Sequence, residues 1–368
     1  MIPLLDLKPQ YQSLQSGLDQ AVQRVMESGY YILGPEVRAL EQEIAEYCGV
    51  KHAIGVASGT DALILSLMAL DIKPGDEVIT TPYSFFATVS SITRTGGIPR
   101  FVDIDPLTFN LDVSQLAAAV TDRTKAIMPV HLFGQTAEMD PVNAVARAHG
   151  LAVIEDAAQA LGARYNDRPA GAMGLMGCFS FFPSKNLGGA GDGGMVTTSD
   201  DGVAARLRRL RVHGASTTYF HEEVGLNSRL DELQAAILRV KLPHLDNWSE
   251  QRRANAALYR EWFHGTSVIA PEERPGTYCI YNQFVVRIGP RRDDLAAELK
   301  RQSIGHSVYY PVPLHLQPCF AQYGGAPGQY PEAELAARET IALPIFPGLT
   351  PDQIETVAKA VVQFTDPA

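Results

Sequence analysis

Short apolar runs alternate with amphipathic stretches along the first 250 residues of the chain. Apolar residues recur at helical spacing in the amphipathic stretches, whereas each run is too short to form a helix. Short runs between helices are typical of strands that are buried on both faces of a mostly parallel sheet. The sequence therefore predicts an α/β fold, with three α/β/α layers around a mostly parallel sheet. The runs cover residues 52–57, 77–80, 98–102, 126–130 and 151–154.

The pattern changes after about residue 245, where the short buried runs stop. The elements expected beyond that point are two helices, a half-exposed strand and a last helix: residues 247–263, 293–302, 282–288 and 351–364. The last of these begins at Thr350 and Gln353, which have the spacing of a capping box. We therefore divide the chain into a large α/β domain, residues 1–246, and a smaller C-terminal α+β domain, residues 247–368.

Composition and charge exclude several classes of protein. Hydrophobic residues make up 46% of the chain, too many for an intrinsically disordered protein. The net charge of −10 disfavours nucleic-acid binding, because an acidic surface repels phosphate. The four cysteines have no metal-binding spacing to one another or to histidine, so no metal site is expected. We see no signal peptide and no apolar stretch near the roughly 20 residues of a membrane helix, so a cytoplasmic location is expected.

An acidic residue follows one of the predicted strands. Residues 154–159 read Ile-Glu-Asp-Ala-Ala-Gln, so Asp156 lies where an apolar strand ends. In parallel α/β sheets, side chains at the carboxyl ends of the strands point into the ligand crevice. The alternative is that Asp156 merely caps the next helix.

Lys185 lies between an aromatic strand and a glycine-rich loop, which cover residues 179–182 and 188–194. Most lysines are solvated surface groups. This placement instead favours a lysine in a pocket, where it loses its proton more easily and can form a Schiff base.

Residues 57–63 lead from a strand through small side chains into a helix. Free backbone N–H groups at the beginning of a helix favour a phosphate, although an ordinary helix cap has the same sequence. This turn, Asp156 and Lys185 are all expected at the crevice edge of the sheet. Their combination predicts one shared ligand site.

These segments resemble those of the DegT/StrS-type sugar aminotransferases, which are fold-type I enzymes that use pyridoxal 5'-phosphate (PLP) and act on nucleotide-linked keto-sugars. The resemblance extends from Leu5 nearly to the end of the chain, with no departure at a cofactor position. It rests on residues 31–35 (YILGP), 58–63 (SGTDAL), 155–159 (EDAAQ), 180–185, 225–229 (GLNSR) and 309–315 (YYPVPLH).

The resemblance implies roles for individual residues of this chain. Lys185 would bind the aldehyde of the cofactor and shuttle protons, and Asp156 would keep the pyridine nitrogen protonated. Gln159 would lie beside the phenolic oxygen, and Phe86 would stack on the ring, unless it is an ordinary core phenylalanine. The phosphate contacts implied are Gly59, Thr60, Ser180 and, from the neighbouring subunit, Asn227. The substrate contacts implied are Arg229, Tyr310 and His315.

The resemblance also implies a reaction and an assembly. Family members with histidine in place of the lysine dehydrate sugars, so Lys185 implies transamination. The implied partners are an amino-acid donor, L-glutamate, and a UDP- or dTDP-linked keto-sugar. The resemblance is to members that aminate C3, so a 3-keto sugar is expected. The product would serve surface polysaccharide or a glycosylated natural product. A homodimer with shared active sites is implied, and residues 226–242 read as a helix whose apolar stripe fits a partner or the large domain. Asn227 is alternatively the N-cap of that helix.

Two other functions stay open. One is a non-catalytic regulatory or scaffold role on the same fold, which Lys185, Asp156 and Gln159 argue against. The other is a different fold-type I enzyme, either an amino-acid aminotransferase or a cysteine desulfurase. Cys319 is the least implausible nucleophile for a desulfurase.

Overall fold

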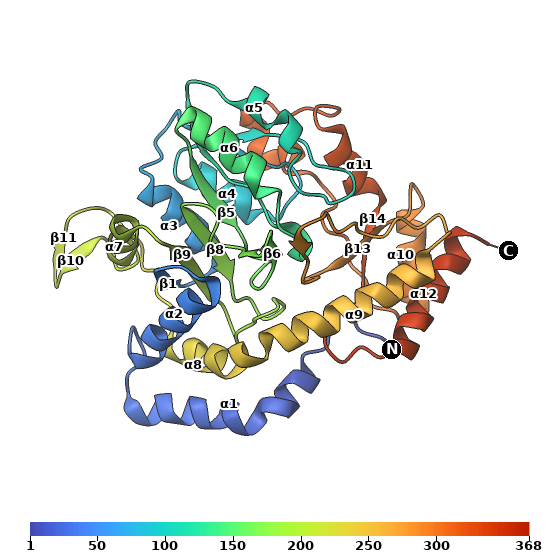
Figure 1. Cartoon of the computed structure of the whole chain (residues 1–368), viewed down its shortest axis with the longest axis horizontal. Coiled ribbons are helices and arrows are strands. Elements are labelled where there is room, and N and C mark those ends of the chain that lie inside the picture. Colours follow the sequence, from blue (N-terminus) through green and yellow to red (C-terminus); the bar gives the residue numbers. More distant parts are fainter. Residues whose placement is uncertain (368) are drawn as a thin grey trace.

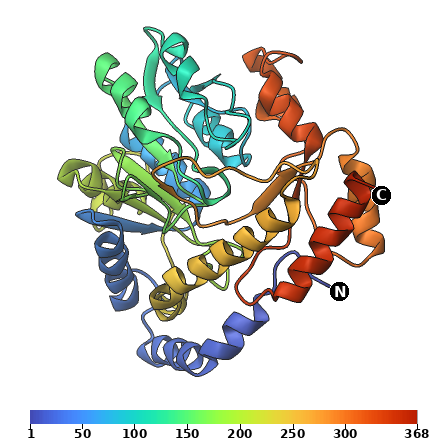
Figure 2. The same ribbon diagram turned by 45° about the vertical axis from the view of Figure 1, so that its right-hand side comes forward.

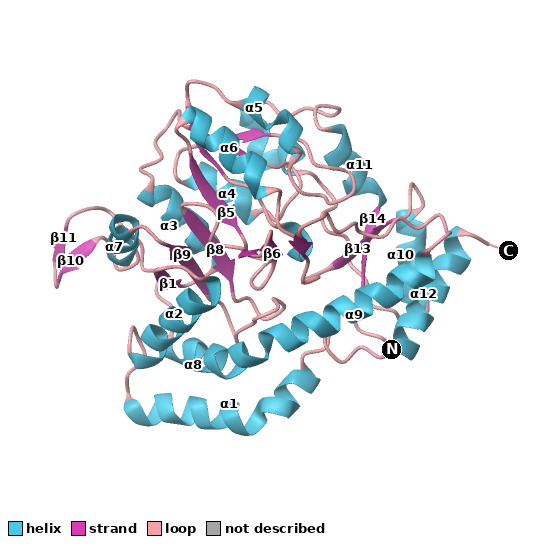
Figure 3. Cartoon of the chain, in the orientation of Figure 1, coloured by secondary structure: helices cyan, strands magenta, loops and turns pink. Residues whose placement is uncertain are grey.

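The computed structural model describes residues 1–367 and contains a seven-stranded sheet flanked by helices (Figure 1, Figure 3). The strand order is β1-β9-β8-β5-β4-β2-β3. All neighbouring pairs are parallel except those that involve β9, which is antiparallel to both β1 and β8. The predicted α/β class is confirmed, but β9 was not predicted. The strands are β1 (His52–Val56), β2 (Glu77–Thr80), β3 (Ile98–Phe101), β4 (Thr124–Ile127), β5 (Ala152–Asp156), β8 (Met176–Ser180) and β9 (Gly194–Thr198).

Successive residues of the strands pack into different core clusters, because side chains alternate across a sheet. On β5, Ile154 packs with helices α3, α4 and α7, whereas Val153 packs with α5 and α6 on the opposite face. The predicted three layers are thereby confirmed. The helices are α2 (Pro35–Cys48), which packs on β1, α3 (Gly59–Ala69), α4 (Ala87–Arg94), α5 (Leu116–Ala119), α6 (Met139–His149) and α7 (Asp201–Leu210).

Helix α8 (Glu232–Lys241) packs along α1 (Lys8–Ser28) and α2 within the same chain. The helix predicted over residues 226–242 therefore begins later, because residues 227 and 231 form bridges to Val212 and Ile32. The N-cap of α8 is Asp231, so the alternative reading of Asn227 as the cap is wrong. The predicted apolar stripe packs largely against its own chain: Leu230 and Ala236 are buried, and Leu233, Ile237 and Val240 are partly buried.

Glu232 joins α8 to the beginning of α2. Its buried carboxylate accepts hydrogen bonds from the amides of Glu36 (2.8 Å) and Val37 (2.9 Å), two of the free N–H groups at that helix terminus. A Cβ on Gly34 would lie 2.8 Å from this carboxyl group, so a side chain beside Pro35, the first residue of α2, would displace the capping carboxylate. The Gly-Pro pair of the segment 31–35 thus serves the docking of α2 on α8.

The C-terminal part packs three helices, α9, α10 and α12, around the antiparallel pair β13 and β14. The predicted helices and strand are confirmed to within two residues, and residues 310–330 contain only short 3-10 turns. The elements are α9 (Leu245–Phe263), β13 (Phe284–Arg287), α10 (Arg292–Arg301), η4 (Leu314–Leu316), η5 (Pro318–Tyr323), α11 (Pro331–Glu339), β14 (Thr340–Leu343) and α12 (Pro351–Thr365).

The division into domains 1–246 and 247–368 stays a proposal, and two segments cross it. Ile2 and Leu5 pack against the C-terminal core, where the N-terminus lies beside α12 (Figure 2). Strand β12 pairs with β6 of the larger part.

The remaining short elements are η1 (Val113–Gln115), η2 (Leu132–Gly134), β6 (Arg164–Tyr165), β7 (Arg168–Pro169), β10 (Ala215–Thr217), β11 (Phe220–His221), η3 (Leu242–His244) and β12 (Thr277–Tyr278). Within residues 1–367, no helix has the length and apolar character needed to cross a membrane.

The capping box of α12 provides a test of local stability. The Thr350 hydroxyl accepts from the Gln353 amide (3.3 Å), and the Gln353 side chain accepts from the Thr350 amide (3.0 Å). Thr350→Ala is expected to lower the free energy of unfolding by about 1 kcal/mol, measured by urea denaturation. Thr356→Ala in the same helix is the control, because alanine is the better helix former there. Equal losses in both variants would contradict a specific capping effect.

Candidate active site

Two neighbouring strands and one helix bring the predicted site together. Asp156 is the last residue of β5 and pairs with Cys178 of β8, and Ser180 ends β8. Lys185 follows in the turn after β8, where its charge interacts with that of Asp156. Helix α3 begins beside Ser180. The three segments selected from the sequence therefore meet at the carboxyl edge of the sheet.

Asp156 is 4% exposed and has two hydrogen-bond donors from the chain. Its Oδ2 accepts from the Thr88 hydroxyl at 2.7 Å, and its Oδ1 accepts from the Ala158 amide at 3.3 Å. Burial raises the pKa of Asp156, and these hydrogen bonds together with the charge of Lys185 act in the opposite direction. No helix follows directly, since residues 157–163 form turns, so the capping alternative is wrong.

Lys185 is partly buried, and its pKa is lowered from 10.5 to about 8. Burial causes the shift because it disfavours the charged ammonium group, while Asp156 favours the charge. At pH 7 a lysine of pKa about 8 is roughly 10% neutral, against about 0.03% for an ordinary lysine. This amine is therefore prepared for attack on a carbonyl.

The beginning of α3 has free donors. The Ser58 hydroxyl accepts from the Asp61 amide, and the Ser58 carbonyl accepts from the Ala62 amide. The amides of Gly59 and Thr60 donate to no acceptor within the described residues. A Cβ on Gly59 would lie 2.6 Å from the Cβ of Ser180, so only glycine lets the Ser180 hydroxyl approach these amides. Two free amides and a hydroxyl suit a phosphate group.

Gln159 and Tyr310 contact each other. The Gln159 Oε1 accepts from the Phe133 amide (2.7 Å), and its Nε2 donates to the Tyr310 hydroxyl (3.0 Å). The amide group has two hydrogens on Nε2, so one stays available for another acceptor. The contacts on both ends fix the orientation of the Gln159 side chain.

Phe86 immediately precedes α4 and is 43% exposed, so it is not an ordinary core phenylalanine. Its ring stacks on that of Phe320 with the centroids 5.1 Å apart and the planes 17° apart. One face of Phe86 is therefore backed by the C-terminal part of the chain. The large exposed fraction lets the ring stack on a further planar group.

His315 has a different environment from the one expected of a substrate contact. It is 2% exposed, and its Nε2 lies 3.2 Å from a carboxylate oxygen of Glu334. Burial lowers the pKa of His315, and Glu334 opposes this shift. The imidazole is enclosed by its own chain.

Asn227 lies on an extended segment beside the turn that begins α3. The next residue, Ser228, is fully buried, and its hydroxyl accepts from the Ala57 amide at 3.2 Å. Neighbouring side chains on extended backbone point to opposite sides. The exposed Asn227 side chain therefore points away from this chain's own α3 terminus, and Arg229, beyond Ser228, is half-buried.

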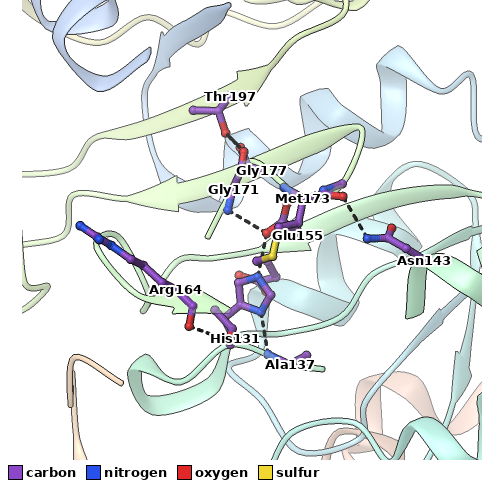
Figure 4. A network of polar contacts seen from close by, with 12 residues as sticks. His131, Ala137, Asn143, Glu155, Arg164, Gly171, Met173, Gly177 and Thr197 are labelled. Carbon is purple, nitrogen blue, oxygen red and sulfur yellow. Dashed lines mark hydrogen bonds and ion pairs between the residues drawn. The ribbon is translucent and has the colours of Figure 1, made fainter. Parts of the chain in front are cut away.

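The sequence patterns identify neither Thr88 nor the buried network around Glu155 that Figure 4 shows. Glu155 accepts from the amides of Gly171, Met173 and Gly174 at 2.6–2.7 Å and contacts Nε2 of His131 at 2.9 Å. The Nδ1 of His131 accepts from the Ala137 amide, so its hydrogen is on Nε2. A glutamate in an apolar strand indicates a buried hydrogen-bond network, because a buried charge needs partners. The network fixes the end of β5.

The buried cysteines do not provide the nucleophilic thiolate that a cysteine desulfurase needs. Cys48, Cys178 and Cys279 are buried, and burial raises the pKa of each thiol. Cys319 is exposed but belongs to the short turn η5.

The chain is similar to known proteins over nearly its whole length. The profile of the DegT/DnrJ/EryC1/StrS aminotransferase family matches residues 12–362. A pleiotropic regulatory protein from Geobacillus stearothermophilus is 51% identical over 99% of this chain and 98% of its own length. UDP-N-acetyl-3-dehydro-alpha-D-glucosamine 3-aminotransferase from Acidithiobacillus ferrooxidans is 44% identical over 98% of this chain and 97% of its own length. The crystal structure of DesV from S. venezuelae in complex with a ketimine intermediate superposes with a TM-score of 0.97, at 44% identity and coverage of 100% and 99%.

Proposed function

This chain belongs to the DegT/DnrJ/EryC1/StrS aminotransferase family, and on that premise we propose that it transfers an amino group from L-glutamate to a UDP- or dTDP-linked 3-keto sugar. The enzyme is a PLP-dependent aminotransferase. The observation that supports the site best is the amine of Lys185, with its pKa of about 8, beside the buried carboxylate of Asp156. The product is an amino sugar for surface polysaccharide or for a glycosylated natural product.

The residues present fit the cofactor. The free amides of Gly59 and Thr60 and the hydroxyl of Ser180 would bind its phosphate, and Phe86 would lie against its ring. Asp156 would face the ring nitrogen, and the free hydrogen on Gln159 would reach the phenolic oxygen. When bound, PLP supplies an aldehyde for the amino group and an electron sink for the carbanion at the donor's Cα.

The side chains of this chain perform the proton chemistry. Lys185 would hold the aldehyde of PLP, and its Nζ, once free of the aldehyde, would move the proton of the donor's Cα. Asp156 stabilises a proton on the ring nitrogen, because a unit charge pair at about 4 Å is worth roughly 4 kcal/mol at an effective dielectric constant of 20. Arg229 and Tyr310 are our candidates for substrate contacts. The enclosed His315 would act on substrate only indirectly, by holding the turn that carries Phe320.

The substrate is tested with a panel of UDP- and dTDP-linked 3-keto and 4-keto sugars and L-glutamate. We expect a 3-amino sugar, identified by mass spectrometry and NMR, and none with Lys185→Ala enzyme. Conversion of 2-oxo acids alone would instead establish an amino-acid aminotransferase.

A regulatory function is the second candidate, because the relative from G. stearothermophilus carries that name. Lys185, Asp156 and Gln159 are all in place here, which favours catalysis. The two candidates differ in one measurement. A purified protein that is yellow from bound PLP and turns over glutamate is an enzyme, whereas a colourless protein without turnover is a scaffold.

We further propose that the working unit is a cytoplasmic homodimer whose sites are shared. Asn227 is exposed and points away from its own α3 terminus, so it is free to reach the phosphate of another subunit. The hairpin of β10 and β11 projects beyond α7 (Figure 1). Its Tyr219 and Phe220 are 94% and 62% exposed, which is unusual for large apolar side chains that have no partner.

Mixing two inactive chains tests the shared site. Lys185→Ala and Asn227→Ala chains are combined under conditions of subunit exchange. If Asn227 serves its neighbour, one site of each heterodimer collects both defects and the other collects neither, so activity recovers to about half per heterodimer. Exchange is verified with differently tagged chains. Activity that stays at the level of the separate variants would show that Asn227 serves its own subunit.

A further inference from the structure

We propose that Thr88 is a positioning residue that keeps Asp156 ionised and aimed at the ring nitrogen of the cofactor, with Ser84 holding Thr88 in turn. The inference rests on the proposed role of Asp156. It concerns a hydroxyl that neither the sequence motifs nor the proposed function account for.

The hydroxyls form a chain with a defined direction. The Thr88 Oγ1 lies 2.7 Å from Oδ2 of Asp156 and 2.8 Å from the Ser84 hydroxyl, and both hydroxyl residues are buried. An ionised carboxylate only accepts, so Thr88 donates its single hydrogen to Asp156. Ser84 must then donate to Thr88. Each hydrogen bond in this order stabilises the negative charge of Asp156.

Thr88 differs from the other hydroxyl residues of α4. Ser91 and Thr93 donate to carbonyls of the preceding helical turn, the usual arrangement for such side chains inside a helix. Thr88 instead bonds to a residue 68 positions away in sequence. Phe86 lies at the N-terminus of the same helix. One helix therefore sets both the aromatic ring for the cofactor and the orientation of the carboxylate.

The surroundings of Asp156 show why this hydroxyl matters. Lys185 is the cation whose charge acts on the carboxylate, while Cys178 and Tyr310 lie near it as neutral groups. The imidazole of His131 bonds to Glu155 instead. Burial disfavours the charged form of Asp156. Without Thr88, the only hydrogen bond that the described part of the chain still donates to the Asp156 carboxylate comes from the Ala158 amide, at 3.3 Å. A protonated Asp156 would no longer hold a proton on the ring nitrogen.

Thr88→Val tests the inference, because valine keeps the shape and removes the hydroxyl. We expect kcat to fall about 10- to 100-fold, the factor that a hydrogen bond to a charged group is worth, with PLP affinity changed less than about threefold. The pH at which the absorption of the bound cofactor changes should also shift. Thr88→Ser should restore both quantities. Thr80→Val is the control, since its buried hydroxyl bonds the Met128 carbonyl instead.

Three outcomes distinguish the inference from its premise. A Thr88→Val enzyme with normal kcat and an unchanged absorption titration would overturn the inference, provided that Asp156→Asn is inactive. A fully active Asp156→Asn enzyme would overturn the premise itself. In the Asp156→Asn background, Thr88→Val should cause no further loss of kcat. If Thr88→Val does not fold, Ser84→Ala replaces it in the test. We then expect smaller changes in the same direction, both in kcat and in the pH at which the cofactor absorption changes. No change in either quantity would contradict the role.

Discussion

Lys185→Ala is expected to abolish both covalent attachment of PLP and transamination, with kcat lowered about 10⁴-fold or more. The variant loses the amine that interacts with Asp156 and whose pKa is lowered to about 8. Borohydride reduction followed by peptide mass spectrometry measures the attachment. Steady-state turnover of glutamate measures the reaction.

A second lysine provides a matched control for that experiment. Lys241 is also partly buried, which lowers its pKa, and its Nζ donates to the carbonyl of Gly188 in the glycine-rich loop after Lys185. Lys241→Ala should retain covalent PLP and most of the turnover. If borohydride traps the cofactor on another lysine at the wild-type level in Lys185→Ala enzyme, the assignment of Lys185 is wrong.

Asp156→Asn is expected to lower kcat about 10³-fold while PLP still binds. Asparagine keeps the size of the side chain but removes the charge, which is worth roughly 4 kcal/mol to a cation about 4 Å away. Absorbance of the purified variant measures its PLP content, and kcat is then expressed per bound cofactor.

A buried carboxylate elsewhere in the chain separates the effect of charge from that of folding. Asp103 is 4% exposed and accepts from the amides of Glu332 and Ala333 at the beginning of α11. Asp103→Asn should lower stability and leave kcat per folded enzyme nearly unchanged. A cofactor-loaded Asp156→Asn enzyme with near-normal kcat would refute the electron-sink role.

The sequence predicts those helices and strands whose ends are determined by residues close to them in the chain. Pro35 at the first position of α2 and the Thr350–Gln353 pair before α12 determine where those helices begin. The sequence predicts Asp156 and Lys185 as site residues because each lies at the end of an apolar strand or just past it, and parallel strands end at a common edge. These predictions needed no knowledge of distant contacts.

Other features depend on residues far apart in the chain. Residues 226–231 have helical spacing, yet their backbone bridges Val212 and Ile32, so tertiary pairing overrides the local preference. The contact of Thr88 with Asp156 and that of His315 with Glu334 join ordinary residue types at unpatterned separations. No periodicity marks such pairs.

The capping of α2 by Glu232 has a consequence for synthesis. The Glu36 amide and the carboxylate that satisfies it are 196 residues apart. At about 5–20 residues per second, a ribosome needs about 10–40 s to make the intervening chain. Throughout that interval the apolar stripes of α1 and α2 have no α8 to cover them. The faces of α1 and α2 that pack on α8 therefore stay uncovered by it until residues 232–241 have been made.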